Sequence, residues 1–379
     1  MEELSVSTLT GILGFGLGLV FGATAQRTNF CTMGAISDMM LMGDWNRFRA
    51  WMLALAVAIL GAQGLHGLEL VDLNRSIYLN TSLGWAGAIV GGLVFGFGMT
   101  MTGGCGYRTL VRFGAGNLKS LVVAIVIGIF AYMTLRGLTG LARVEFESMT
   151  NINLVDAGLA SQGMPDMVAA VTGMSLEAAR WALTLAFAGG LLWFCFKSAR
   201  FRASPRNIVA GLILGALVPA AWYATGVIGF DDFEPAPLAS FTFVAPVGES
   251  LQYLMTFTGS TINFGIAAVG GVIAGSFAAA KGSGTFRVES FVDANDMFRH
   301  IIGGAIMGMG GVMALGCTIG QGLSGFSTLA LGSLIALLSI VAGGVLGIKY
   351  LPGGQAPCMA PATVAGGPGV ISSSRLTFR

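Results

Sequence analysis

The sequence predicts an all-α integral membrane protein. Hydrophobic residues make up 54% of the 379 residues and charged residues only 10%, whereas a soluble domain carries about 25% charged residues. Apolar runs of about 20 residues, the length that spans a bilayer as a helix, alternate with short polar stretches. A transmembrane barrel would instead alternate in segments of about 10 residues. The net charge of +2 gives no reason to expect a nucleic acid as partner.

One glycine-rich stretch occurs twice. Residues 91–105 and 303–317 share five glycines and a final cysteine in register, so that position 91 corresponds to position 303 without a gap. Small residues let helix backbones approach closely in a membrane, but packing does not require a cysteine at the end of each copy. We therefore expect Cys105 and Cys317 to have a role beyond packing.

The first part of the chain is expected to combine complete spans with short helices. The apolar run 32–42 follows a complete span and is too short to cross the bilayer, which predicts a re-entrant half helix. A short amphipathic segment follows Cys105 in the same way. The expected spans are about 8–25, 49–64, 83–102 and 120–135.

A polar insertion separates this part from a second one of similar outline. The insertion covers residues 136–180, and a linking span at 181–196 follows it. The second part is expected to contain spans at about 207–227, 262–280, 300–316 and 329–347, and a short helix at about 249–257. We therefore expect a first membrane repeat (1–135), the insertion with its linking helix (136–206), a second repeat (207–348) and a C-terminal tail (349–379).

The count of about nine spans predicts the orientation. A single crossing between two similar halves inverts the second, which gives an inverted-topology repeat. The loop 197–206 contains four basic residues and no acidic one, so it should be cytoplasmic. The N-terminus and the acidic loop at 231–234 then lie outside, and the C-terminus lies in the cytoplasm. Glu2 and Glu3 stand where a signal peptide would be basic, so none is expected.

Three of the five cysteines follow a break in an apolar helix: Cys31, Cys105 and Cys317. Irregular backbone at membrane depth is tolerated only where it is buried in protein or lines a cavity, so these thiols are expected beside a path. Cys195 lies in a continuous apolar span and Cys358 in the tail, and neither is expected to take part. No paired cysteine spacing and only two histidines are present, so we expect no metal and no cofactor.

Polar and small residues beside these breaks are secondary candidates for the path. Intramembrane arginine is costly and usually functional, although Arg108 could also extend its side chain to the interface. Asn29, Thr318 and Gln321 could donate hydrogen bonds to an anion or satisfy the broken backbone. Gly104 and Gly316 directly precede two of the thiols.

These segments together resemble the YeeE/YedE family of sulfur-compound transporters. The resemblance covers nearly the whole chain and implies thiosulfate uptake through the bacterial inner membrane. It also implies an hourglass of helices whose constriction is lined by central thiols, here Cys31, Cys105 and Cys317. A TusA-like sulfurtransferase on the cytoplasmic side would be a separate partner. The motifs that carry the resemblance lie at 29–35, 103–108, 116–120 and 303–317.

The chemistry of thiols fits passage of an anion. A dianion needs its hydration replaced, but a strong site would trap it, and thiols are weak donors. We therefore expect three thiols to relay the anion through weak S–H hydrogen bonds. The alternatives are a membrane thiol-disulfide oxidoreductase, a scaffold for a sulfur-handling partner, and transport of selenium compounds, sulfite or sulfide. The lack of a Cys-X-X-Cys motif counts against the oxidoreductase, so we expect a transporter and not an enzyme.

Overall fold

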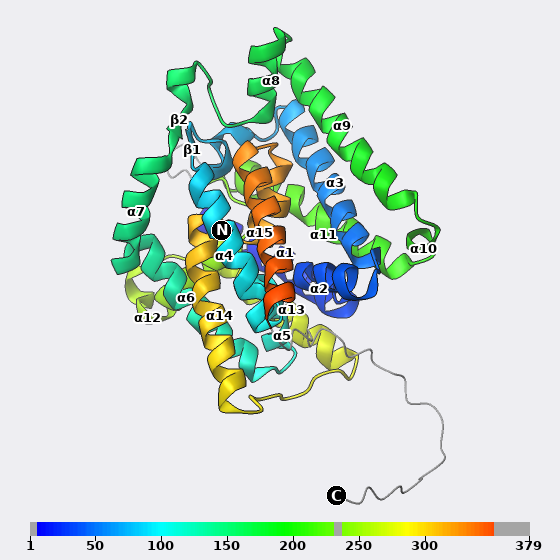
Figure 1. Cartoon of the computed structure of the whole chain (residues 1–379), viewed down its shortest axis with the longest axis vertical. Helices are drawn as coiled ribbons and strands as arrows, with labels where there is room; N and C mark the ends of the chain where they lie inside the picture. The colour runs from blue at the N-terminus through cyan, green and yellow to red at the C-terminus, as the bar shows by residue number, and fades with distance from the viewer. Residues whose placement is uncertain (1–5, 231–236, 352–379) are drawn as a thin grey trace, which may run out of the picture.

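The computed structural model describes residues 6–230 and 237–351 of the chain, and it is built almost entirely of helices (Figure 1). Within these residues, eight segments are helical, long and apolar enough to cross a membrane, which confirms the prediction of an all-α integral membrane protein. Glu2, Glu3, the acidic loop at 231–234 and Cys358 lie outside the described residues. The eight segments are Val6–Met42, Asn46–Gly67, Trp85–Gly114, Leu118–Arg136, Leu176–Phe196, Pro205–Ile228, Phe264–Gly282 and Leu331–Tyr350.

The first six helices comprise four complete spans and two short helices. The two short ones, α2 and α5, begin directly after Cys31 and Cys105 and follow the ends of α1 and α4, as the apolar run lengths predict. A π-helix, Asp38–Met42, continues α2. The elements are α1 (Val6–Thr28), α2 (Thr32–Ser37), α3 (Asn46–Gly67), α4 (Trp85–Thr102), α5 (Gly106–Gly114) and α6 (Leu118–Arg136).

The polar insertion folds over the loop between α3 and α4. It contains α7 (Leu138–Thr150) and α8 (Met164–Thr172), and its strand β2 (Ile152–Asn153) pairs antiparallel with β1 (Ser82–Leu83). The linking helix α9 (Leu176–Phe196) packs on α3 and lies at the edge of the molecule in Figure 1. Short helical pieces complete this region: Leu73–Arg75, Ile77–Leu79, Leu154–Ala157 and α10 (Ala199–Arg202).

Two helices in the last part of the chain begin earlier than the sequence predicts. The short helix α12 begins at Val244, whereas we expected it at about 249, and α14 begins at Ala294 because the Asp293 side chain caps it by accepting from the Asp296 N–H. The first two turns of α14 are polar, so it is not among the eight apolar spans, and the count of nine stays a prediction. The elements are α11 (Pro205–Tyr223) with the π-helix Ala224–Ile228, α12 (Val244–Met255), the 3-10 turn Phe257–Gly259, α13 (Phe264–Gly282), α14 (Ala294–Met313), the π-helix Gly320–Gly325 and α15 (Leu331–Tyr350).

Glycine faces let the helices that carry the cysteines pack backbone to backbone. Helix α1 lies along α13, and α4 packs on both α14 and α15 (Figure 1). A Cβ atom added at Gly22 would come within 2.2 Å of the Val272 carbonyl oxygen, and one added at Gly96 within 2.1 Å of the Ile340 carbonyl oxygen. Such approaches are typical of membrane helix interfaces, where close packing stabilises association. The repeated glycines thus hold α4 and α14 against their neighbours.

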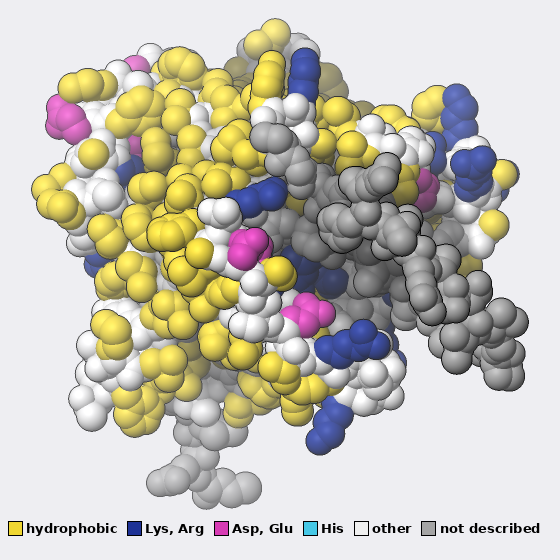
Figure 2. Space-filling view, turned by 60° about the horizontal axis from the view of Figure 1, so that its bottom comes forward, with side chains coloured by type: hydrophobic (Ala, Val, Ile, Leu, Met, Phe, Trp, Pro, Cys, Tyr) yellow, Lys and Arg dark blue, Asp and Glu magenta, His cyan; other side chains and the backbone are white. Residues whose placement is uncertain are grey.

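Helices and caps that are related by the offset of the repeated stretch, which takes position 91 to position 303, have similar places in the two halves of the chain. Cys31 is the N-cap of α2, and Phe243, which matches it at the same offset, is the N-cap of α12. By the same offset, α4 corresponds to α14 and α6 to α15. Helix α4 packs on α15, and α14 packs on α6, so the same pair of contacts occurs twice with the two halves exchanged. These correspondences support the predicted inverted repeat and its domain boundaries, both of which remain predictions. Hydrophobic side chains are widespread on the face shown in Figure 2, as expected for a lipid-facing protein.

Candidate functional site

The Cys31 thiol caps the start of a half helix. Helix α1 ends at Thr28, and Asn29 then takes a left-handed backbone conformation with φ 54°. Two residues later Cys31 is extended, and its Sγ accepts a hydrogen bond from the Gly34 N–H at 3.4 Å. The reversal of the chain therefore places the sulfur at the N-terminus of α2, where the helix dipole favours negative charge.

Cys317 has the same local structure at the end of α14. Leu315, two residues before it, has φ 56°, and the Cys317 Sγ accepts from the Gly320 N–H at 3.4 Å. Four non-glycine residues in the described part of the chain have positive φ, and two of them, Asn29 and Leu315, stand two positions before a thiol. Backbone conformations of this kind are costly and cluster at functional sites.

The Cys105 thiol lies between the other two. Helix α4 ends at Thr102 and is followed by its C-cap Gly103, which has φ 66°. Cys105 is the N-cap of α5 but makes no side-chain capping bond. Its thiol lies beside the side chains of Cys31 and Thr318 and is close enough to Cys317 for the two thiols to interact electrostatically. Three helix breaks far apart in the sequence therefore bring their thiols to one place.

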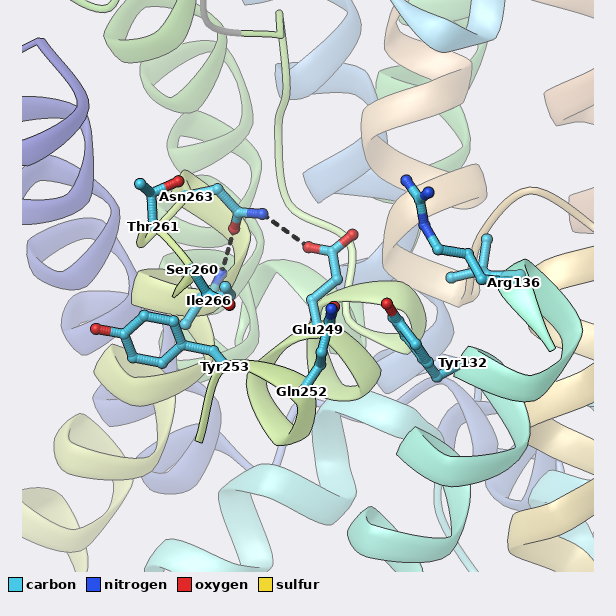
Figure 3. A pocket seen from close by; sticks show the side chains of 10 residues that line it. Tyr132, Arg136, Glu249, Gln252, Tyr253, Ser260, Thr261, Asn263 and Ile266 are labelled. Atoms are coloured by element: carbon cyan, nitrogen blue, oxygen red, sulfur yellow. Dashed lines mark hydrogen bonds between the residues drawn. The ribbon is translucent and has the colours of Figure 1, made fainter. Parts of the chain in front are cut away.

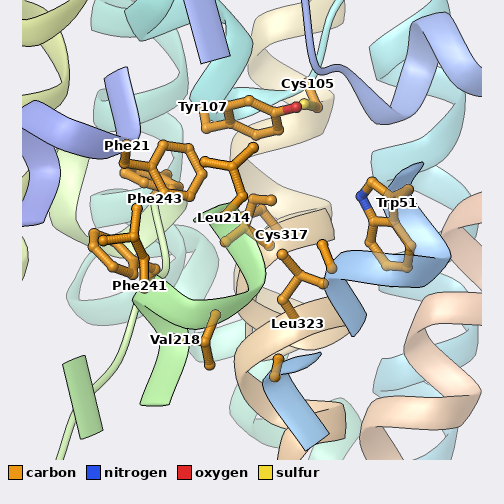
Figure 4. Packing of buried hydrophobic residues seen from close by; sticks show 14 of the residues in the cluster. Phe21, Trp51, Cys105, Tyr107, Leu214, Val218, Phe241, Phe243, Cys317 and Leu323 are labelled. Carbon is orange, nitrogen blue, oxygen red and sulfur yellow. The ribbon is translucent and has the colours of Figure 1, made fainter. Parts of the chain in front are cut away.

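This place is buried in the core of the helical assembly. Cys31 is 2% exposed, and Cys105 and Cys317 are fully buried. Aromatic rings surround the thiols, and the Tyr107 hydroxyl donates to the Phe30 carbonyl at 2.7 Å, which ties the start of α5 to the segment before Cys31 (Figure 4).

Two arginines hold the turn that precedes Cys31. Arg108, 7% exposed, donates to the Asn29 Oδ1 at 2.9 Å and to the Ala25 carbonyl at 3.3 Å. Arg47 donates to the Asn29 carbonyl at 2.7 Å and to the Asp38 carboxylate at 2.9 Å. The sequence predicts Arg108 and Asn29 as path residues but gives no such prediction for Arg47 or Asp38. The available signal was an acidic residue inside the short apolar run 32–42 and a basic residue shortly after it.

Several buried polar atoms near the thiols have no hydrogen-bond partner of normal geometry among the described residues. They include the hydroxyls of Thr32 and Thr318, the indole Nε1 of Trp51 and the Oε1 of Gln321. The other end of the Gln321 amide donates to the Ala314 carbonyl at 2.5 Å. In Figure 4 the Trp51 nitrogen is on the edge of its ring that is turned toward the thiols. Unpaired buried polar groups call for an explanation, and a ligand that binds there is one.

The remaining sequence candidates have plainer surroundings. The Gly104 carbonyl accepts a hydrogen bond from the Thr102 hydroxyl at 2.9 Å. Gly316, directly before Cys317, has φ 158°. Cys195 lies on α9 and its thiol donates to the Arg49 carbonyl at 3.2 Å, so it is a packing residue with a partner of its own. It is not part of the cluster formed by the other three described cysteines.

The loop before α4 reaches toward Cys317. Tyr78, 4% exposed, packs edge-on against Trp222 with ring centroids 6.3 Å apart. Burial raises the pKa of the Tyr78 phenol, and the nearby Cys317 thiol raises it further. Tyr78 therefore lies near the Cys317 thiol, on this side of the cluster.

A separate cavity of about 360 Å³ lies between α6, α12 and α13. Its lining includes Tyr132, Arg136 and Tyr253, and the Asn263 side chain donates to the Glu249 carboxylate at 2.8 Å within it (Figure 3). None of the described cysteines lines this cavity, so it does not belong to the thiol cluster.

Comparison with known proteins gives one family and several relatives. A family model described as Sulphur transport matches residues 27–346. Thiosulfate transporter TsuA of Escherichia coli (strain K12) is 28% identical over 326 residues, which cover 82% of this chain and 86% of that protein. Thiosulfate transporter TsuA of Spirochaeta thermophila is 27% identical over 339 residues, 88% of this chain and 96% of that protein. A probable transporter, YedE of Escherichia coli, is 33% identical over 93 residues, 24% of this chain and 20% of that protein.

Proposed function

Because this chain belongs to the sulphur transport family, we propose that it takes up thiosulfate and relays it along the thiols of Cys31, Cys105 and Cys317. The chain is a multi-pass membrane protein and a transporter, not an enzyme. The relatives of similar length are both named as thiosulfate transporters, which supports this anion as the substrate over selenium compounds, sulfite or sulfide.

One observation carries the proposal: three buried thiols from three separate helix breaks lie together. The Cys105 side chain interacts with Cys31 and lies near Cys317. Helix packing alone does not require three membrane helices to be interrupted at neighbouring positions. Irregular backbone at membrane depth is tolerated only where it is buried in protein or lines a cavity.

The electrostatics suit an anion that must not be retained. Helices α2 and α5 begin at Cys31 and Cys105, so their positive N-terminal ends face the thiols. The guanidinium groups of Arg47 and Arg108, beside the Cys31 turn, already donate to Asp38, Asn29 and Ala25. A thiol is a weak donor. The anion would thus meet several weak sites instead of one strong site, which permits release.

The secondary path residues have distinct proposed roles. Arg108 and Asn29 hold the Cys31 turn in place beside Cys105. Gln321 offers an unpaired Oε1 beside the Cys317 segment. Gly104 and Gly316 connect the helix ends to the thiols: the Gly104 N–H donates to the Met99 carbonyl at 3.1 Å and the Gly316 N–H to the Gly311 carbonyl at 2.7 Å.

We further place the protein in the bacterial inner membrane with its N-terminus outside and its C-terminus in the cytoplasm. The basic segment 197–206 supports this orientation. Cys317 beside Tyr78 would then face the outside and Cys31 the cytoplasm, so the anion would pass Cys317, Cys105 and Cys31 in that order. A separate TusA-like sulfurtransferase on the cytoplasmic side would receive it.

Uptake of radiolabelled thiosulfate by cells that lack other uptake systems tests the proposal. Wild-type protein should restore uptake and growth on thiosulfate as the sole sulfur source. Cys105→Ala and Cys317→Ala should be inactive, and Cys105→Ser should be impaired because a hydroxyl is a stronger, harder donor than a thiol. Cys195→Ala is the matched control and should transport normally.

Two results would contradict the relay. Serine variants with wild-type uptake would show that the thiols are dispensable. A disulfide between Cys31 and Cys105 detected by mass spectrometry during turnover would instead support thiol-disulfide exchange.

A further inference from the structure

The sequence Cys-Thr-X-Gly occurs at both ends of the thiol cluster. It is Cys31-Thr32-Met33-Gly34 in one place and Cys317-Thr318-Ile319-Gly320 in the other. In both, the sulfur accepts from the glycine N–H three residues on, at 3.4 Å. Each threonine therefore occupies the first helical position directly after a thiol. Cys105, in the middle, is followed by Gly106 and makes no such cap.

Both threonine hydroxyls are buried and lack a partner of normal geometry among the described residues. Thr32 is 4% exposed and Thr318 fully buried. Other buried helical threonines donate to the carbonyl four residues back, as Thr184 does to Arg180 at 2.8 Å. For a threonine at the first helical position, the carbonyl four residues back lies before the helix break. For Thr318 this is the Ala314 carbonyl, which already accepts a hydrogen bond from the Gln321 side chain. Among the described residues neither hydroxyl thus has a carbonyl or other partner of normal geometry, and the Thr318 side chain is left beside the Cys105 thiol.

We propose that Thr32 and Thr318 are anion-binding donors that hold the oxygen end of the substrate at two stations, one beside Cys31 and one between Cys317 and Cys105. The Thr318 side chain lies beside the Cys105 thiol. Thiosulfate has a soft terminal sulfur and three hard sulfonate oxygens. A hydroxyl suits the oxygens, while a thiol, softer and weaker, suits the sulfur. The inference rests on the proposed function and adds a basis for selecting an oxyanion over sulfide.

Valine has the shape of threonine without the hydroxyl, so Thr318→Val and Thr32→Val test the role of each donor. We expect the KM for uptake of radiolabelled thiosulfate to rise about tenfold in each variant, since each loses a hydrogen bond to a charged acceptor. Thr318→Ser restores the donor and should return the KM toward that of the wild type. Thr184→Val, which removes a hydroxyl that does have a partner and lies on the remote helix α9, is the control and should keep the wild-type KM.

A second measurement separates binding from a structural role. The melting temperature of the purified protein without thiosulfate should change little in Thr318→Val, because the hydroxyl makes no hydrogen bond of normal geometry with the described residues, but the increase on adding thiosulfate should shrink. A lower melting temperature with an unchanged increase would overturn the inference, as would a wild-type KM in both valine variants. If the wild type itself takes up no thiosulfate, the proposed function fails instead.

Discussion

One of the tightest contacts between two long helices predicts a large effect from a single methyl group. Gly96 lies on α4, the helix that leads to Cys105, and faces α15. A Cβ atom added there would lie 2.1 Å from the Ile340 carbonyl oxygen and 2.7 Å from the Gly344 nitrogen, whereas ordinary contacts begin at 3.4 Å. Gly96→Ala would therefore push the two helices apart, because both obstacles are backbone atoms that cannot rotate away.

The expected cost follows from two opposing terms. Overpacking costs up to about 3 kcal/mol, and replacing a helical glycine by alanine returns up to about 1 kcal/mol. We expect Gly96→Ala to lower the free energy of unfolding by about 2 kcal/mol, measured by reversible unfolding in detergent, and to reduce thiosulfate uptake because α4 positions Cys105.

Gly190→Ala is the matched control, since a Cβ at Gly190 on α9 would meet nothing within 4 Å. It should be as stable as the wild type or slightly more stable. Equal stability of the Gly96 variant and the wild type would refute the steric reasoning. Equal destabilisation by both variants would show that any added methyl is harmful in this protein.

Three other predictions concern orientation and polar contacts. Reporter fusions should place the N-terminus outside and the C-terminus in the cytoplasm, and both termini on one side would contradict the inverted repeat. Arg108→Gln should reduce uptake about tenfold by releasing the Asn29 turn, while Arg200→Gln, on the exposed surface, should not; equal loss in both would point to a general effect of basic charge. The Lys119 ammonium lies 2.6 Å from the Asp296 carboxylate at the starts of α6 and α14. A double-mutant cycle of Lys119→Gln and Asp296→Asn should give a coupling energy of about 1 kcal/mol for this partly exposed pair, and a value near zero would show that the pair contributes nothing to stability.

The local sequence was sufficient for the class of protein and for the location of the helix breaks. Apolar run length and charge depletion reflect the bilayer directly, since every backbone group within it must be paired in the same segment. The same reasoning located the half helix after Cys31, because the run 32–42 is too short to span. It misplaced the start of α14, although Asp293 three positions before Asp296 is a recognisable helix cap.

The sequence predicts that the three thiols share a path, but only the tertiary structure shows how they are arranged there. The local sequence does not show that the Cys105 thiol lies beside the Cys31 thiol, because this depends on how α1 and α4 are placed relative to each other. The local sequence also does not show that Arg47 donates to the Asn29 carbonyl, or that the hydroxyls of Thr32 and Thr318 lack a partner of normal geometry among the described residues. A hydroxyl is known to lack a partner only when every neighbouring carbonyl has been placed, and those neighbours come from helices that are distant in the chain.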